Sequence, residues 1–206
     1  MLLRAVMRFT LGIIAAVLVG LAIGGASALV LSGIWPRGGA LASVSAIDVD
    51  GWRSDFAVGS DAADPYTRAR IARHGLLALA QSEAVYFTRT TDERGRLLRE
   101  NCTYRLSGEG QPARWWSITL YDSDSRLPMN EDDALSVDAS ETGEGPWAAT
   151  ISRRKPPQAE NWISSRNAGT FDLTLRLYVP AQGVLDAPEK NLNPPRISRL
   201  DCAGED

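Results

Sequence analysis

The feature that most constrains this chain is an apolar run without charged residues that extends from Phe9 to Trp35. A membrane core about 30 Å thick is crossed by roughly 20 apolar residues in a helix, so the run is long enough to span it. Arg4 and Arg8 precede the run, and all 25 acidic residues follow it. The positive-inside rule therefore predicts that residues 1–8 are cytoplasmic, that residues 9–35 form a transmembrane anchor, and that the remainder lies outside the cytoplasm.

A cleaved signal peptide is the alternative to this anchor. Ala26-Ser27-Ala28 has the small-x-small form of a cleavage site and follows an apolar core that begins near Leu11. The apolar run continues through Leu29 to Leu31, beyond that site, which favours a retained anchor. Sequencing of the mature amino terminus distinguishes the two, because a start at Leu29 excludes the anchor.

The segment after the run is long enough for one ordinary domain. Residues 36–61 are rich in Gly, Ala, Ser and Asp, and we interpret them as a connector with one short strand near Val44 to Val49. Residues 62–206 then form the domain. Its net charge is negative, whereas a nucleic-acid-binding domain usually carries a basic face, so we expect no nucleic-acid partner.

Within the domain, Asp64-Pro65 opens a predicted helix that extends to about Ser82, with Asp64 as its cap. Apolar and polar residues then alternate with a period of two, which is typical of strands with one buried face. The strands predicted in this way cover residues 84–90, 98–106, 116–120, 147–151, 171–179 and 197–202. Short strands separated by Gly, Pro and Asn loops predict a mainly β, antiparallel sandwich or barrel.

Cys102 and Cys202 are the only cysteines. Two cysteines in an oxidising compartment commonly pair, and a disulfide here would place the last predicted strand near the strand 98–106. The alternative is two separate buried thiols.

Small residues recur every fourth position within the apolar run and would form one smooth stripe on a helix. Such a stripe lets helices approach closely and suggests a homodimer, although glycine and alanine are also simply common in membrane spans. The residues of this stripe are Gly12, Ala16, Gly20, Gly24 and Ala28.

Two stretches of the domain resemble a known family of bacterial proteins. They are Trp115-Trp116-Ser117-Ile118-Thr119-Leu120-Tyr121-Asp122, and Asn161-Trp162 followed by Phe171-Asp172-Leu173-Thr174-Leu175-Arg176-Leu177-Tyr178-Val179-Pro180. Together they resemble the domain-of-unknown-function 1214 family, and residues 64–69 and 83–87 resemble its short, membrane-anchored members. The resemblance implies a β-sandwich of jelly-roll type and no established activity. Taken with the predicted anchor and its orientation, it leads us to expect a domain in the periplasm, held by the bacterial inner membrane.

The chain departs from the family pattern at two loops. The family often has Asp-Gly after the Tyr-Asp strand end and Trp-Leu-Pro after the asparagine, whereas this chain has Asp124-Ser125 and Trp162-Ile163-Ser164.

No catalytic constellation stands out, so no catalytic residue is assigned. His74 is the only histidine, which excludes a histidine metal cluster, and two cysteines offer too few ligands for a thiol zinc site. We therefore expect no metal and no cofactor. A carboxylate-dependent hydrolase stays open, with Glu83, Glu100 and Asp122 as candidates. Glu100 falls on the apolar face of its strand and would need a partner there, for which Arg176 and Tyr104 are candidates.

The aromatic residues indicate binding. We expect Trp116 and Trp147 in the core, whereas a ring in a loop suits a ligand with a flat apolar face and polar edges. The candidate ligand-binding residues are Asn161, Trp162, Tyr121, Arg176 and Tyr178. The leading hypothesis is a binding or envelope-associated module for a glycan or a small organic ligand. The alternatives are the hydrolase and a structural partner in an envelope complex.

Overall fold

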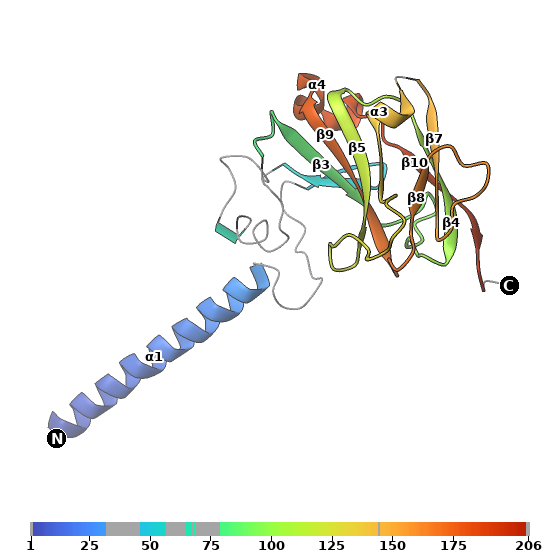
Figure 1. The fold of residues 1–206 in the computed structure, drawn as a ribbon. Helices are drawn as coiled ribbons and strands as arrows, with labels where there is room; N and C mark the ends of the chain where they lie inside the picture. The colour runs from blue at the N-terminus through green and yellow to red at the C-terminus, as the bar shows by residue number, and fades with distance from the viewer. Residues whose placement is uncertain are drawn as a thin grey trace. The chain divides into compact units, whose positions relative to one another are not determined.

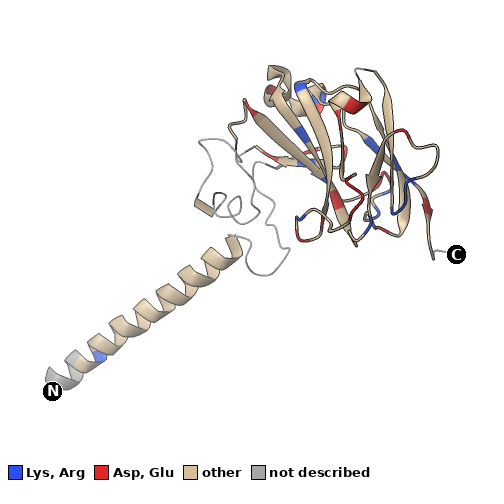
Figure 2. Ribbon diagram, viewed as in Figure 1, with Lys and Arg blue, Asp and Glu red and all other residues tan. Residues whose placement is uncertain are grey.

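The computed structural model describes residues 2–31, 46–56, 65–66, 68, 79–143 and 145–204. The chain divides into one unit that holds the helix α1 and a second unit that holds the strands. Helix α1 (Leu2–Leu31) contains the stretch Met7–Leu31, which is long and apolar enough to cross a membrane and is not buried. Charged residues are absent from most of this helix but mix in both signs over the strands (Figure 2). A membrane anchor and a signal sequence both fit such a helix.

The larger sheet has six strands in the order β1-β2-β3-β9-β5-β6, all antiparallel. Its long central strands are β9 (Phe171–Pro180) and β5 (Ala113–Asp122), and β3 (Ala84–Arg89) lies on the other side of β9. The edges are formed by β6 (Ser136–Asp138) and by the hairpin of β1 (Ala46–Val49) and β2 (Trp52–Asp55). The strands predicted for residues 84–90, 116–120 and 171–179 are thus confirmed.

The β1–β2 hairpin lies inside the segment expected to be a connector. Asp50 and Gly51 both have positive φ angles, of 51° and 84°, as a two-residue Asp-Gly hairpin turn requires. Arg53 of β2 is paired with Thr88 of β3, so the hairpin is part of the sheet. The β-rich unit therefore includes residues before position 62, where the sequence placed its start.

The smaller sheet has four strands in the order β10-β4-β7-β8. Strands β10 (Arg196–Cys202), β4 (Cys102–Gly108) and β7 (Trp147–Ser152) are antiparallel, and β8 (Trp162–Ser164) joins β7 in parallel. The sheet system is therefore mixed rather than purely antiparallel. The short helices α3 (Ala139–Thr142), α4 (Gln182–Asp186) and α5 (Pro188–Asn191) complete the unit.

The two sheets form two layers that share one hydrophobic core (Figure 1). Trp116 of β5 stacks on Trp147 of β7 with their ring centroids 5.0 Å apart, which confirms that both fill the core. Tyr104 of β4 meets Phe171 of β9 edge-on at 5.9 Å. Burial of these large rings stabilises the fold, because each removes a large apolar surface from water.

Cys102 and Cys202 form a disulfide, as the sequence predicted. They are directly opposite each other on β4 and β10, so the last strand does pair with the strand that carries Cys102.

Two local expectations need correction. Strand β4 begins at Cys102 rather than at Leu98, and Glu100 lies in the turn before it. The partners of the Glu100 carboxylate are the amide of Gly169, which donates a hydrogen bond of 2.7 Å, and Arg153 at 3.3 Å, not Arg176 or Tyr104. The helix predicted for residues 64–82 falls mostly outside the described residues.

Candidate functional site

The outer face of the six-stranded sheet gathers polar and aromatic side chains from its three central strands. Alternation sends the odd-numbered residues of β9, such as Leu173 and Leu175, into the core and the even-numbered residues to the opposite face. The register places Tyr86 beside Arg176, Trp115 beside Tyr178, and Tyr121 beside Asp172. We call this surface the Arg176 face, and its residues are Tyr86, Trp115, Thr119, Tyr121, Asp172, Thr174, Arg176 and Tyr178.

Arg176 is the centre of this face. Its guanidinium donates hydrogen bonds to the hydroxyl oxygen of Thr119, at 2.9 Å, and to that of Tyr121. It also lies 5.2 Å from the ring centroid of Tyr121 and 6.0 Å from that of Tyr86. These contacts come from three adjacent strands, so the arginine fixes both tyrosine rings in position.

Trp115 and Tyr178 form the other aromatic pair of this face. Their ring centroids are 5.2 Å apart and the planes are tilted by 54°. The indole N–H of Trp115 donates to the hydroxyl of Ser140, at 3.1 Å. Ser140 belongs to α3, whose start is capped by Asp138, so the orientation of the indole depends on a well-formed helix start.

Asp172 is a titratable group of the Arg176 face with a strongly shifted pKa. Burial raises the pKa of its carboxyl from 3.8 to about 6. A hydrogen bond donated by the Thr174 hydroxyl opposes this shift, the charge of Asp122 adds to it, and the charge of Arg176 lowers it again. Burial also raises the pKa of the nearby Tyr86 hydroxyl. The Arg176 face is thus a half-buried polar surface whose net charge changes near neutral pH.

Replacement of Asp172 by asparagine is expected to remove a pH dependence of stability. Between pH 4 and 6 the folded chain holds a proton on Asp172 that the unfolded chain releases, so the wild-type free energy of unfolding falls as the pH rises. The loss, complete above about pH 6, is at most about 3 kcal/mol. The Asp172→Asn variant should therefore be more stable than wild type at pH 7.5, by about 1–3 kcal/mol, and equally stable at pH 4.

Thermal unfolding at pH 4.5, 6.0 and 7.5 measures this effect. Asp124→Asn is the matched control, because Asp124 is an exposed aspartate in the turn after β5. A wild-type stability that rises from pH 4.5 to 7.5 in step with the Asp172→Asn variant would contradict the raised pKa.

The structure brings together three of the five candidate ligand residues from the sequence. Tyr121, Arg176 and Tyr178 lie on the Arg176 face, whereas Asn161 and Trp162 lie at β8 in the other sheet. The Trp162 indole donates to the carbonyl oxygen of Ser152, at 3.2 Å, and to its hydroxyl, at 3.1 Å. The Asn161 amide donates to the carbonyl oxygen of Ala148. These two side chains therefore hold β8 against β7 and do not share a surface with the other three.

Sequence reasoning did not single out Tyr86 or Asp172 as site residues. Asp172 occupies the same wet face of its strand as Arg176, four residues away, so the alternation that placed Arg176 also places Asp172. Tyr86 required knowledge of strand pairing, because it lies beside Arg176 only through the β3–β9 register.

The carboxylates proposed for hydrolysis have structural partners. Glu83 accepts a hydrogen bond from the amide of Ala80, and Asp122 accepts from the amides of Asp124 and Arg126 in the turn after β5. Glu100 is bound as described above. Among the described residues, no group of three or more His, Cys, Asp or Glu side chains is placed to hold a metal ion.

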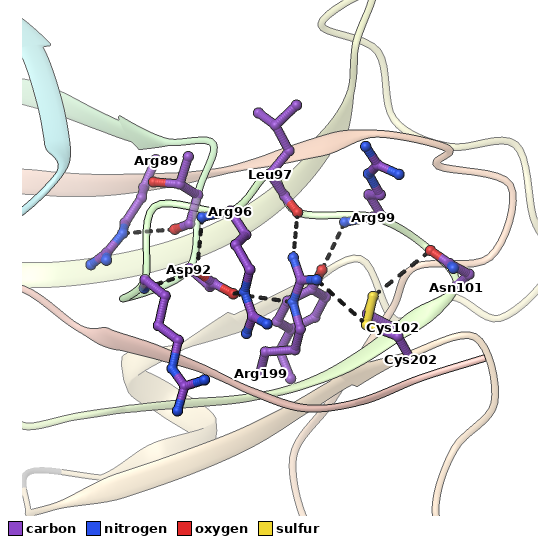
Figure 3. A network of polar contacts seen from close by, with 12 residues as sticks. Arg89, Asp92, Arg96, Leu97, Arg99, Asn101, Cys102, Arg199 and Cys202 are labelled. Atoms are coloured by element: carbon purple, nitrogen blue, oxygen red, sulfur yellow. Dashed lines mark hydrogen bonds and ion pairs between the residues drawn. A yellow bond between two sulfur atoms is a disulfide. The ribbon is translucent and has the colours of Figure 1, made fainter. Parts of the chain in front are cut away.

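A second polar cluster lies where the loop before β4 meets β10 (Figure 3). The Asp92 carboxylate, 1% exposed, contacts the Nε atoms of Arg96 at 2.8 Å and Arg199 at 3.1 Å. Arg199 also lies 5.5 Å from the ring centroid of Tyr104 and donates to the carbonyl oxygen of Leu97. Burial alone would raise the pKa of the Asp92 carboxyl, but bonds from Arg96 and Arg94 outweigh it and hold the pKa below its ordinary value. This cluster joins elements that are distant in sequence, and we interpret its role as stabilising the fold.

Comparison with known proteins identifies a family and a fold. Residues 83–182, from the start of β3 to the start of α4, match the model of a family described as "Protein of unknown function (DUF1214)". No curated protein matches the chain.

Solved structures similar to the chain include the following two. The VPA0106 protein from Vibrio parahaemolyticus is 20% identical, with a TM-score of 0.54 over 66% of this chain and 35% of that one. An uncharacterised protein from Burkholderia cenocepacia is 14% identical, with a TM-score of 0.43 over 59% of this chain and 31% of that one. The chain thus corresponds to about a third of each of these proteins. The similarity to the VPA0106 protein shows a shared fold only.

Proposed function

Because the chain belongs to the DUF1214 family, whose description assigns no activity, we propose a function from its own surface: a binding module that takes a glycan or a similar ring-bearing polar ligand on the Arg176 face. The observation that carries this proposal is the grouping of four half-buried aromatic rings on one face of the sheet: Tyr86 and Tyr121 lie around the Arg176 guanidinium, and Trp115 and Tyr178 contact each other.

Aromatic rings held in this way suit a sugar ring. A pyranose has flat C–H faces that stack on indole and phenol rings, and hydroxyl edges that need hydrogen-bond partners. The Trp115–Tyr178 pair offers the stacking rings, while the Tyr121 hydroxyl and the Asp172 carboxyl offer the polar groups. Because Arg176 already donates to Thr119 and Tyr121, its role is to position the rings rather than to take the ligand directly.

Binding of sugars to the full-length chain in detergent micelles tests this proposal. We expect at least one cell-envelope sugar to raise the melting temperature, since a ligand at a hundred times its dissociation constant adds about 2.7 kcal/mol to the free energy of unfolding. Trp115→Ala and Tyr178→Ala should each weaken that binding by about tenfold or more, because each removes one stacking ring.

Trp162→Ala is the matched control, because Trp162 is a partly buried tryptophan in the other sheet. It should leave sugar affinity unchanged. Loss of binding in Trp162→Ala but not in Trp115→Ala, or no response to any sugar, would overturn the proposal.

A carboxylate-dependent hydrolase is the second candidate, and the pKa of about 6 at Asp172 favours it. A carboxyl that is still partly protonated near neutral pH is suited to donate a proton to a leaving group. Under this alternative, Asp172→Asn abolishes turnover of a chromogenic glycoside while sugar binding persists. Binding without turnover in the wild type supports the module instead.

For the location, we propose that residues 9–35 anchor the chain in the bacterial inner membrane, with the amino terminus in the cytoplasm and the domain in the periplasm. The apolar helix α1 and the disulfide support this proposal. We also propose that the two layers form a jelly-roll sandwich. Two further predictions remain: a structural role in an envelope complex, and a homodimer through the stripe of small residues at Gly12, Ala16, Gly20, Gly24 and Ala28. A reporter fused to the carboxyl terminus tests the orientation, and cytoplasmic reporter activity would exclude it.

A further inference from the structure

Beside the Asp92 cluster lies an open hollow of about 810 Å³ that the proposed sugar site does not use. Its lining joins the β1–β2 turn, the end of β3 and the start of β10, and the residues used below are Asp50, Arg89, Glu93, Pro194, Pro195 and Arg196. We call it the Arg89 hollow. Arg89 occupies a core-side position of β3, opposite in direction to Tyr86, so the hollow and the Arg176 face lie on different sides of the sheet.

Arg89 is a buried cation that faces this hollow, and only 7% of the residue is exposed. Its Nε donates to the carbonyl oxygen of Thr91, at 2.9 Å. Among the described residues, its two terminal nitrogens make neither a hydrogen bond nor an ion pair (Figure 3). An arginine has four further N–H donors at these nitrogens. In Arg89 they are not sealed in the core, so they are free to donate to oxygen acceptors in the hollow, from water or from a ligand.

The turn above Arg89 holds the guanidinium in place. A Cβ atom at Gly51 would lie 3.3 Å from the Nε of Arg89, so the turn backbone packs closely against the arginine. Fixed by Gly51 on one side and by the Thr91 carbonyl on another, the guanidinium presents its terminal fork to the hollow without further ordering. A fixed fork is the geometry that binds a carboxylate through two parallel hydrogen bonds.

Four carboxylates surround Arg89, and three of them have a cationic partner. Asp48 binds Arg53 at 3.0 Å, Glu93 binds Arg196 at 3.1 Å, and Asp92 binds Arg96 and Arg199. The fourth, Asp50, is exposed and has no hydrogen bond or ion pair to its carboxylate among the described residues. It acts on Arg89 only through charge, at a distance. The hollow thus offers one unengaged cation and one unengaged anion that do not bind each other.

We propose that the Arg89 hollow binds a small zwitterion, an amino acid or a short peptide, with Arg89 holding its carboxylate and Asp50 its ammonium group. An anion without a positive group is disfavoured, because it would meet the carboxylates around Arg89. A cation without a negative group gains no hydrogen bonds from the Arg89 donors. Pro194 and Pro195 add an apolar wall for the side chain of the ligand.

Binding of matched alanine derivatives to the full-length chain in detergent micelles tests this assignment. The probes are L-alanine and Ala-Ala, which carry both charges, N-acetyl-L-alanine, which lacks the ammonium group, and L-alanine amide, which lacks the carboxylate. We expect at least one of the first two to bind by calorimetry or by NMR shift changes. The two blocked probes should bind about tenfold or more weakly.

Two variants and a control make the result specific. Arg89→Met should abolish binding of the zwitterion, and Asp50→Asn should weaken it by about tenfold, because asparagine keeps the positive φ of the turn but removes the charge. If Arg89→Met does not fold, Asp50→Asn decides alone. Arg126→Met removes an exposed arginine in the turn after β5, outside the lining of the hollow, and should leave binding unchanged.

Several outcomes would overturn the inference. They are undiminished binding in Asp50→Asn, equal binding of N-acetyl-L-alanine and L-alanine, and no binding of any probe at millimolar concentration. The sugar test uses other residues and other ligands, so either site can fail without the other.

Discussion

Replacing Cys102 and Cys202 together by serine is expected to lower the free energy of unfolding by about 3–5 kcal/mol. The bridge closes a loop with a sequence separation of 100 residues. A loop of this length removes conformational entropy from the unfolded chain worth up to about 4.7 kcal/mol. The bridge also ties β10, an edge strand, to β4, and β10 carries Arg199 into the Asp92 cluster. Its loss should therefore destabilise the carboxyl-terminal strand most.

Urea unfolding followed by tryptophan fluorescence, in mild detergent and at constant protein concentration, measures this loss. Reductant is the internal control: it should shift the wild-type transition toward that of the Cys102→Ser/Cys202→Ser variant and leave the variant itself unaffected. Amide hydrogen exchange should show the largest loss of protection in β10. Equal urea midpoints for the variant and the oxidised wild type would contradict a stabilising bridge.

The second large effect is expected at Asp92. Asp92→Asn should destabilise the domain by about 3–5 kcal/mol, because it removes the Asp92 charge that pairs with the nearly buried guanidinium of Arg199. The Asp92 carboxylate also accepts hydrogen bonds from the backbone N–H groups of Arg94 and Arg96. An asparagine side chain has only one acceptor oxygen, because its other terminal atom is an NH₂ donor. The loop before β4 and the strand β10 should then separate more easily.

A double-mutant cycle apportions this effect. Arg199→Met alone should also destabilise, whereas Asp92→Asn combined with Arg199→Met should recover part of the loss, because both charges of the pair are then removed together. The control is Arg196→Met, which breaks the ion pair with Glu93 on the same strand. Arg196 has a side chain that is 76% exposed, so this change should cost less than about 1 kcal/mol. Strictly additive losses at Asp92 and Arg199 would show that the two residues act independently.

Much of the fold was predictable because most strands bury one face only. The alternation in residues 171–179 and 116–120 is a local consequence of a half-buried strand, and both strands occur where the pattern places them. The pattern was less reliable before Cys102, where Leu98 is buried but precedes the strand. Leu98 is buried from the segment before the strand, and a buried residue in a loop can look like the first apolar position of an alternating strand.

Short strands were harder to predict, because their stability comes from partners far away in the chain. Strand β8 has three residues and exists through its parallel pairing with β7. The β1–β2 hairpin lies in a segment rich in small residues. The sequence predicted a strand near β1 but not its partner β2, although the Asp50-Gly51 turn was a usable signal. Composition alone favoured a connector there, and pairing with β3 outweighs that weak preference.

The candidate site divides in the same way. Tyr121, Arg176 and Tyr178 were selected from sequence and lie together, whereas Trp162 was selected for its place in an expected loop and lies in the other sheet. Arg89 could have been noticed as a charged residue at a core-side position of its strand, since Val85 and Phe87 share that side. The proposed role of Arg89 depends on its neighbours in the hollow, the turn at Gly51 and the start of β10. No local sequence pattern shows that these segments lie beside Arg89.

The sequence by itself determined the apolar helix, the mainly β character of the domain, the cysteine pair and the family, because each of these depends on composition, on a short period or on a motif. Only the tertiary structure decided which side chains share a surface. Strand order sets Tyr86 beside Arg176, and strand β10 sets Arg199 beside Asp92. Such contacts depend on the free energy of packing the whole chain, and neighbours along the sequence carry almost no information about them.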